Sequence, residues 1–204
     1  LKLTFLSLCI LCAAACTKEE PNTPTEPQIA EKTIFVFMPH STNLYKYLLD
    51  NIAGMKRAIE SNKGLGNTRL VVFIAKDKKQ SALINIKYDK GVCKQDTLEK
   101  FYSPIYITTN GRVELLNKVK QYAPANRYAM IVGCHGMGWI PSSTVCKAKK
   151  SRYFGGLENG YKIDIDDFAE SIKAAGMKMQ FILFDDCYMS CMEVAYDLKD
   201  ATDY

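Results

Sequence analysis

Several features that would classify this chain quickly are missing from its sequence. Its 27 basic and 22 acidic side chains are mixed along the chain, with a net charge of only +5, so no nucleic-acid partner is expected. No Gly-x-Ser-x-Gly elbow occurs, which excludes the nucleophile of the α/β-hydrolase esterases. The longest apolar run, residues 3–15, is too short to span a bilayer comfortably. The remaining composition, with 48% hydrophobic and 24% charged residues, is that of a globular domain.

The first residues have the pattern of an export signal. Lys2 precedes the apolar run 3–15, which ends in alanines directly before Cys16. This resembles the lipobox of bacterial lipoproteins, in which the cysteine is acylated and becomes the mature N-terminus, and an ordinary secretory signal is the alternative. We therefore expect a signal peptide at residues 1–15 and a lipid anchor on Cys16. The acidic residues that follow resemble the export signal of surface-exposed lipoproteins, so the cell envelope, and within it the outer membrane, is the expected location.

Residues 16–32 differ in composition from the rest of the chain. They are rich in Pro, Thr and Glu, and three of the seven prolines fall among them. Such a segment cannot form a packed core and is typical of a semi-rigid tether. We expect it to hold a folded domain, residues 33–204, away from the membrane surface.

Within that domain, short apolar runs alternate with helical patterns. Buried strands are predicted at residues 33–38, 70–75, 128–134 and 180–185, and helices at residues 44–59, 110–123 and 165–175. Alternating apolar residues in 82–107 indicate hairpin-like strands, whereas 142–160 has the composition of a loop. Strands that alternate with crossover helices favour an α/β fold with a mainly parallel sheet covered on both faces. Ligands of such sheets bind outside the carboxyl ends of the strands.

A histidine and a cysteine follow two of these predicted strands. His135 comes after residues 128–134, and Cys187 comes just after residues 180–185. A cysteine nucleophile needs a base or acid within hydrogen-bond reach, and adjacent parallel strands can bring the two side chains together. A buried structural thiol and a turn histidine are the alternatives. No metal site is expected, because a zinc site built from these two residues with Cys134 and Cys191 would match none of the usual ligand spacings.

The residues around His135 and Cys187 resemble a known peptidase family. Cys134-His135-Gly136-Met137-Gly138-Trp139 and Phe184-Asp185-Asp186-Cys187-Tyr188-Met189 are similar to the His and Cys motifs of the clostripain family of cysteine peptidases. The similarity covers most of residues 33–198 and implies a caspase-like, three-layer α/β sandwich. It also implies cleavage of proteins and peptides after Arg or Lys, without a required cofactor and with calcium as a family option. Clostripain-like chains continue with further strands, so the resemblance implies that this chain is truncated after the helix that follows Cys187.

The resemblance assigns roles to individual residues. Cys187 would attack the scissile carbonyl, and His135 would help to form the thiolate or protonate the leaving amine. The backbone N–H groups of Gly136 and Cys187 would bind the oxyanion. Asp185 has the family position in the pocket for the residue before the scissile bond, where a carboxylate would select Arg or Lys. Asp186 replaces a small residue, and three roles stay open for it: a second pocket acid, a partner for a helix N-terminus, or a perturbation of the site.

A basic segment lies between the two motifs. Lys147, Lys149, Lys150 and Arg152 are candidate self-cleavage positions for an enzyme of this specificity, and a solvated basic loop is the alternative. The competing interpretation of the whole chain is a non-catalytic surface lipoprotein or an inactive, truncated peptidase homologue.

Overall fold

The computed structural model describes residues 28–40, 43–138, 153–156, 158 and 160–204. The helices are α1 (Tyr45–Ser61), α2 (Thr109–Tyr122), α3 (Ile165–Ala174) and α4 (Met192–Leu198). The strands are β1 (Ala30–Met38), β2 (Thr68–Asp77), β3 (Gln80–Asp89), β4 (Val92–Phe101), β5 (Ala125–Val132), β6 (His135–Gly136), β7 (Tyr153–Gly155), β8 (Lys162–Asp164) and β9 (Met179–Phe184). Within these described parts, no helix has the length and apolar character needed to cross a membrane.

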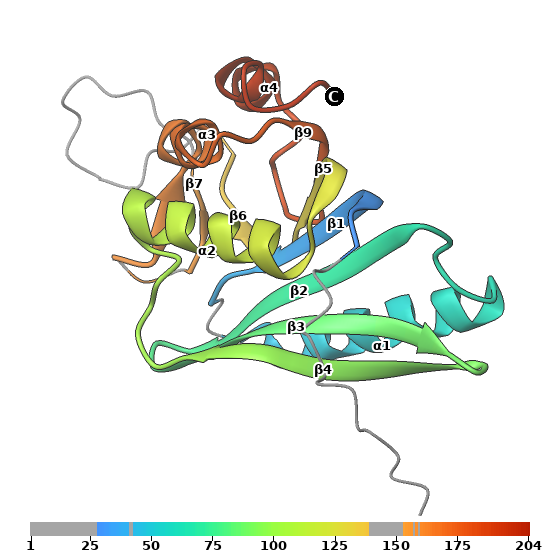
Figure 1. Cartoon of the computed structure of the whole chain (residues 1–204). Coiled ribbons are helices and arrows are strands. Elements are labelled where there is room, and N and C mark those ends of the chain that lie inside the picture. The colour runs from blue at the N-terminus through green and yellow to red at the C-terminus, as the bar shows by residue number, and fades with distance from the viewer. Residues whose placement is uncertain (1–27, 41–42, 139–152, 157, 159) are drawn as a thin grey trace, which may run out of the picture.

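Six strands form the central sheet in the order β4-β3-β2-β1-β5-β9 (Figure 1). β1 pairs in parallel with β2 and β5, and β9 pairs in parallel with β5. β3 and β4 form the antiparallel hairpin that the alternation in residues 82–107 predicts. The expected α/β fold with a mainly parallel sheet is therefore confirmed. β1 begins at Ala30, so the sheet includes the last residues of the segment that was expected to be a tether.

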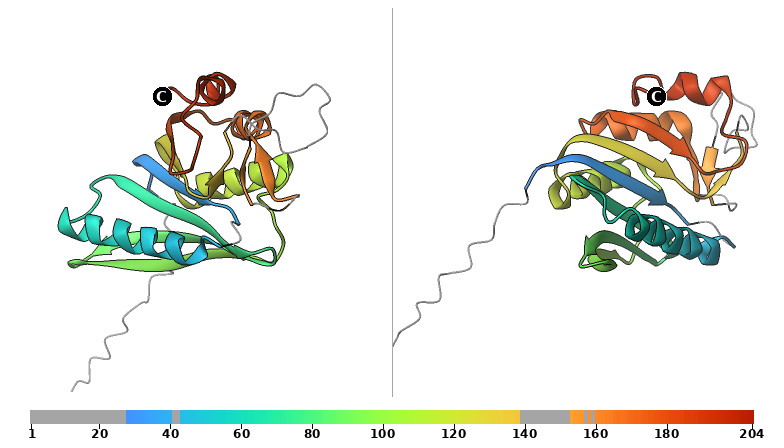
Figure 2. Two further views of the ribbon diagram at one scale, coloured as in Figure 1. Left: turned by 180° about the vertical axis from the view of Figure 1, so that it is seen from behind. Right: turned by 90° about the vertical axis from the view of Figure 1, so that its right-hand side faces the viewer.

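Helices cover both faces of this sheet, which gives three layers (Figure 2). On one face, the buried residues include Val36, Met38, Val72 and Ile74 of the strands with Leu48, Ile52 and Ile59 of α1. On the other face, they include Phe35, Phe37, Phe73 and Met130 of the strands with Leu116 and Val119 of α2 and Phe168 and Ile172 of α3. Successive strand residues alternate between the two cores because side chains alternate along a strand. Each buried side chain of this size stabilises the fold by roughly 1.5–3 kcal/mol.

A buried arginine joins the helices α2 and α3. Arg112 is only 3% exposed. Its guanidinium donates to Ser171 Oγ at 2.8 Å, to the Ile107 carbonyl oxygen at 2.7 Å and to the Asp167 carbonyl oxygen at 3.1 Å. Burial lowers the pKa of Arg112 to about 10, so it stays charged at neutral pH. The charge is accommodated because hydrogen bonds that the guanidinium donates to several protein acceptors replace its hydration.

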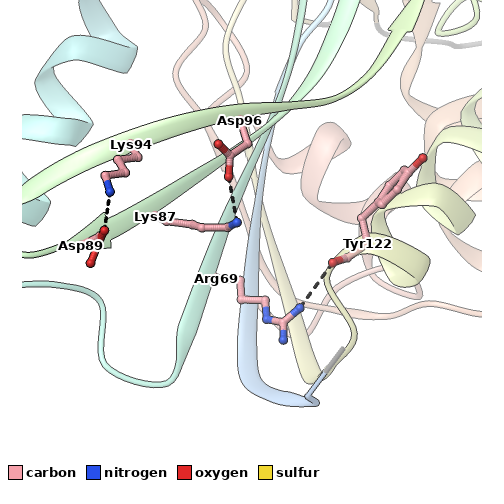
Figure 3. A network of polar contacts seen from close by, with 6 residues as sticks. All are labelled: Arg69, Lys87, Asp89, Lys94, Asp96 and Tyr122. Atoms are coloured by element: carbon pink, nitrogen blue, oxygen red, sulfur yellow. Dashed lines mark hydrogen bonds and ion pairs between the residues drawn. The ribbon is translucent and has the colours of Figure 1, made fainter. Parts of the chain in front are cut away.

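Polar contacts lie on the β3–β4 hairpin and at the start of β2 (Figure 3). Lys87 of β3 pairs with Asp96 of β4 at 2.8 Å, and Lys94 pairs with Asp89 in the same hairpin. Arg69 of β2 donates to the carbonyl oxygen of the last residue of α2 at 3.3 Å. Exposed ion pairs contribute only about 0.2–1 kcal/mol each, so the two apolar cores hold the sheet together.

A second, small sheet holds the histidine. Its strands have the order β6-β7-β8, with His135 opposite Gly155 and Gly136 opposite Phe154. β7 lies inside residues 142–160, so the prediction of a continuous loop there was wrong. Strands of two or three residues are too short to show an alternating pattern in the sequence.

Candidate active site

The central sheet brings the predicted histidine and cysteine to one edge. β5 ends at Val132 and leads to His135, while the neighbouring strand β9 ends at Phe184 and leads to Cys187. The N–H of Asp185 donates to the Val132 carbonyl oxygen at 2.8 Å, so the parallel pairing continues until both segments leave the sheet. The strand ends thus place the two motifs side by side, as the sequence predicts.

The two motif segments touch through their backbones. A Cβ atom on Gly136 would overlap the carbonyl oxygen of Cys187 and lie 2.8 Å from Cγ of Met189. A Cβ atom on Gly138 would lie 2.5 Å from the carbonyl oxygen of Tyr188, and Gly138 also has a φ of +57°. Only glycine has both the space and the conformational freedom for this packing. The glycines after His135 therefore let the cysteine segment approach.

Tyr188, which follows the cysteine, has a left-handed backbone with a φ of +60°. This conformation is unfavourable for a residue with a side chain. The side chain is 77% exposed, so packing of the ring does little to offset the strain. Strain of this kind is typical of functional turns, and here it reverses the chain directly after Cys187.

His135 is held by an asparagine from the first strand connection. Its Nε2 lies 2.7 Å from Oδ1 of Asn43. An amide oxygen only accepts hydrogen bonds, so Nε2 carries the hydrogen of the neutral ring and Nδ1 is the nitrogen that accepts a proton. Burial lowers the pKa of His135, which favours the neutral ring at pH 7. Asn43 has no role among the sequence predictions, although a polar residue soon after the end of β1 was a usable signal.

Cys187 is exposed and forms no disulfide. Its thiol is therefore accessible to a substrate, as a nucleophile must be. The buried structural thiol near the site is Cys134, which is 5% exposed.

Asp185 faces the α1 side of the sheet. Its Oδ2 accepts a hydrogen bond from Asn51 Nδ2 of α1 at 3.3 Å. It lines a cavity of about 440 Å³ together with Asp50, Gly54 and Arg57 of the same helix. Neither Cys187 nor His135 lines this cavity. Asn51 is a second polar residue whose role the sequence did not reveal, because its contact with Asp185 depends on how α1 packs on the sheet.

Asp186 has different partners from Asp185. Its Oδ1 accepts a hydrogen bond from the Cys134 N–H at 2.6 Å, and Oδ2 accepts one from Cys134 Sγ at 3.2 Å. Burial raises the pKa of Asp186 to about 7, and burial together with the nearby Asp186 carboxylate raises that of the Cys134 thiol. Among the three roles left open, the geometry supports a structural partner, although of a strand end and not of a helix N-terminus.

A sequence profile of the clostripain family matches residues 36–204. The chain belongs to the clostripain family. A solved structure described as a secreted C11 cysteine protease from Bacteroides thetaiotaomicron, "iotapain", is 41% identical, with a TM-score of 0.80 over 87% of this chain and 51% of that chain. No curated protein matches the sequence.

Two further clostripain-family structures have lower TM-scores. An inactive zymogen C11 protease from Parabacteroides distasonis is 28% identical, with a TM-score of 0.70 over 87% of this chain and 48% of that one. A clostripain from B. thetaiotaomicron in complex with the peptide inhibitor BTN-VLTK-AOMK is 35% identical, with a TM-score of 0.55 over 57% of this chain and 100% of that one. The present chain spans about half the length of iotapain and of the zymogen.

Two further sets of predictions for this clostripain-family chain concern metal binding and the residues at the N-terminus and in the basic segment. Among the residues that the structure describes, no group of three or more His, Cys, Asp or Glu side chains could hold a metal ion. Cys134, His135, Cys187 and Cys191 do not form such a group, and the calcium option stays a prediction. The predicted signal peptide, Cys16, Lys147, Lys149, Lys150 and Arg152 lie outside the described residues.

Proposed function

We propose that this clostripain-family chain is a cysteine endopeptidase that cleaves polypeptides after Lys or Arg. The observation that carries the proposal is the backbone contact of Gly136 with Cys187, because it joins the His and Cys motifs at one sheet edge. The exposed Cys187 thiol and the bonded His135 ring supply the two groups that thiol catalysis needs.

In the first half of the proposed reaction, Nδ1 of neutral His135 takes the thiol proton of Cys187. The thiolate then attacks the scissile carbonyl carbon, and the carbonyl oxygen becomes an oxyanion. The backbone N–H groups of Gly136 and Cys187 donate hydrogen bonds to that oxyanion. His135 returns the proton to the amine of the leaving peptide, and a thioester remains on Cys187.

In the second half, water replaces the leaving peptide. Nδ1 of His135 takes a proton from the water as its oxygen attacks the thioester carbonyl. Collapse of the tetrahedral intermediate breaks the C–S bond, releases the carboxylic acid product and returns the proton to Sγ of Cys187. Throughout, Asn43 Oδ1 accepts the Nε2–H and so fixes the tautomer in which Nδ1 is the proton acceptor of the ring.

Preference for a basic side chain rests on the cavity beside α1. Asp185 and Asp50 bring two carboxylates to it, and a Lys ammonium or Arg guanidinium would be held by charge-assisted hydrogen bonds. Arg57 lines the same cavity, so the carboxylates must outweigh its positive charge. The inhibitor BTN-VLTK-AOMK of the B. thetaiotaomicron clostripain, with a Lys before its AOMK group, supports the same specificity.

Two processing steps complete the proposal. A bond within residues 147–152 is cut by the enzyme itself, since Lys147, Lys149, Lys150 and Arg152 offer basic residues between the motifs. Acylation of Cys16 anchors the protein in the cell envelope, at the outer membrane, as the alanines before that cysteine suggest.

The decisive test is covalent labelling of the full chain by a Lys- or Arg-containing acyloxymethyl ketone. We expect a mass adduct on Cys187 that is absent from a Cys187→Ala control. Asp185→Asn should slow labelling by the basic probe more than labelling by a matched norleucine probe. A folded wild-type chain that acquires no adduct would contradict the proposal and support the inactive homologue.

A further inference from the structure

We propose that Asp186 is a positioning residue for the Cys187–His135 pair and acts through its two contacts with Cys134. The inference rests on the proposed function and adds a residue to which the resemblance assigns no role. Asp186 directly precedes Cys187, and Cys134 directly precedes His135. A link between Asp186 and Cys134 therefore connects the backbones that carry the two reacting side chains.

The link consists of two hydrogen bonds to one residue, which we call the Asp186–Cys134 clasp. Oδ1 of Asp186 accepts from the Cys134 N–H at 2.6 Å, and Oδ2 accepts from Cys134 Sγ at 3.2 Å. Because both carboxylate oxygens are bonded, the Asp186 side chain can neither rotate freely nor move away from Cys134. The clasp thus determines how the segment before His135 lies against the segment before Cys187.

Neighbouring groups restrict the clasp further. The Gly155 N–H also bonds to the Cys134 thiol, and Gly155 pairs with His135 in the small sheet. On the other side, a Cβ on Gly136 would lie 3.0 Å from Cβ of Asp186, so the Asp186 side chain is closely packed. A displacement of Asp186 would therefore move His135 in two ways: through Cys134, which precedes His135 in the chain, and through Gly155 of β7, which pairs with His135.

The hydrogen bonds of the clasp can be separated experimentally from the negative charge of Asp186. The groups that act on the Asp186 carboxyl are the Cys134 N–H and thiol and the adjacent Asp185 carboxylate. Asp186→Asn removes the charge but keeps an oxygen for the Cys134 N–H and supplies an N–H for its sulfur. Asp186→Ala removes the charge and both contacts. The comparison of these two variants therefore isolates the positioning effect.

The experiment measures two reactions of Cys187 on the full chain. The rate of labelling by a Lys acyloxymethyl ketone reports the assembled site, and the pH dependence of alkylation by iodoacetamide reports the apparent pKa of the thiol. We expect Asp186→Asn to be labelled within about threefold of the wild-type rate and Asp186→Ala to be slowed about tenfold or more, because small misplacement of a catalytic group is costly. The apparent thiol pKa of Asp186→Ala should also exceed that of Asp186→Asn, because the thiolate loses its placed histidine.

Cys134→Ala is the second variant, in case Asp186→Ala does not fold by circular dichroism. It deletes only the thiol contact, so its labelling rate should lie between those of Asp186→Asn and Asp186→Ala. Equal labelling and equal thiol pKa values in Asp186→Asn, Asp186→Ala and Cys134→Ala would overturn the proposal. A third outcome separates the two proposals. If the wild-type protein resists the ketone, the peptidase function is refuted. If the apparent pKa of the Cys187 thiol nevertheless differs between Asp186→Asn and Asp186→Ala, the positioning role of the clasp is still supported.

Discussion

The buried carboxyl of Asp186 should make the stability of this protein depend on pH in an unusual direction. Most carboxylates in folded proteins stabilise the fold as pH rises, because native contacts favour their ionised form. Asp186 does the opposite, since burial raises its pKa from an ordinary 3.8 to about 7. Replacement of this residue by asparagine removes the titration but leaves a side chain of the same shape.

The magnitude follows from the two pKa values. The change from 3.8 to about 7 corresponds to about 4 kcal/mol, because a tenfold change in proton affinity is about 1.4 kcal/mol. Between pH 4 and pH 7 the folded chain keeps a proton on Asp186 that the unfolded chain has lost. The free energy of unfolding therefore falls as pH rises through this interval and levels off above it.

Urea denaturation at pH 5 and pH 8 measures the effect. Wild type and Asp186→Asn share every other titrating group. The change in the free energy of unfolding between the two pH values is therefore measured for each protein, and the difference between these changes is the contribution of Asp186. We expect wild type to lose about 3 kcal/mol more than the variant between the two pH values. A reductant is required because the four described cysteines, Cys93, Cys134, Cys187 and Cys191, are free thiols. Equal losses in both proteins would show that Asp186 ionises normally in the folded chain and would refute the reasoning.

Three other substitutions test the packing and the site. Gly136→Ala should lower the unfolding midpoint and abolish labelling of Cys187, because its Cβ would overlap the Cys187 carbonyl oxygen. Asn43→Leu should reduce kcat about tenfold or more with little change in KM, because His135 loses the acceptor for its Nε2–H. Arg112→Met should cost about 3 kcal/mol in urea denaturation, because its carbonyl and hydroxyl acceptors lose their buried donor.

Matched controls are available for the two stability variants. Gly54→Ala lies within α1, where its Cβ would be 3.7 Å from Arg57 Nη2, so it should leave the unfolding midpoint unchanged or raise it. Arg127→Met affects an exposed pair with Glu31 and should cost less than about 1 kcal/mol. If Gly136→Ala and Gly54→Ala behave alike, the close approach at Gly136 has no energetic consequence. A similar result for Arg112→Met and Arg127→Met would argue against the buried network.

The fold was predictable to the extent that it follows from periodic burial. Spacings of four and seven place Leu48, Ile52 and Ile59 on one face of α1, and all three are buried. Uninterrupted apolar runs such as 70–75 become strands with both faces covered. The small β6-β7-β8 sheet escaped prediction because its strands are stabilised by pairing and not by a pattern of their own.

The candidate site was predictable in its reacting residues but not in the groups that hold them. His135 and Cys187 follow strands of a parallel sheet, so their proximity follows from topology. The partners Asn43 and Asn51 escaped the role assignment because each is polar, common and separated from its contact by more than 90 positions in the chain. No local pattern records a contact over such a distance.

The sequence by itself determined the α/β architecture, the two peptidase motifs and their place at the ends of neighbouring strands, because burial periodicity and motif text are local properties. Only the tertiary structure decided which atoms meet. It turned Asp185 toward α1 and Asp186 toward Cys134, although the two residues are identical and adjacent. The physical reason is that alternation on a strand predicts opposite sides, whereas the partners on each side are supplied by packing of distant segments.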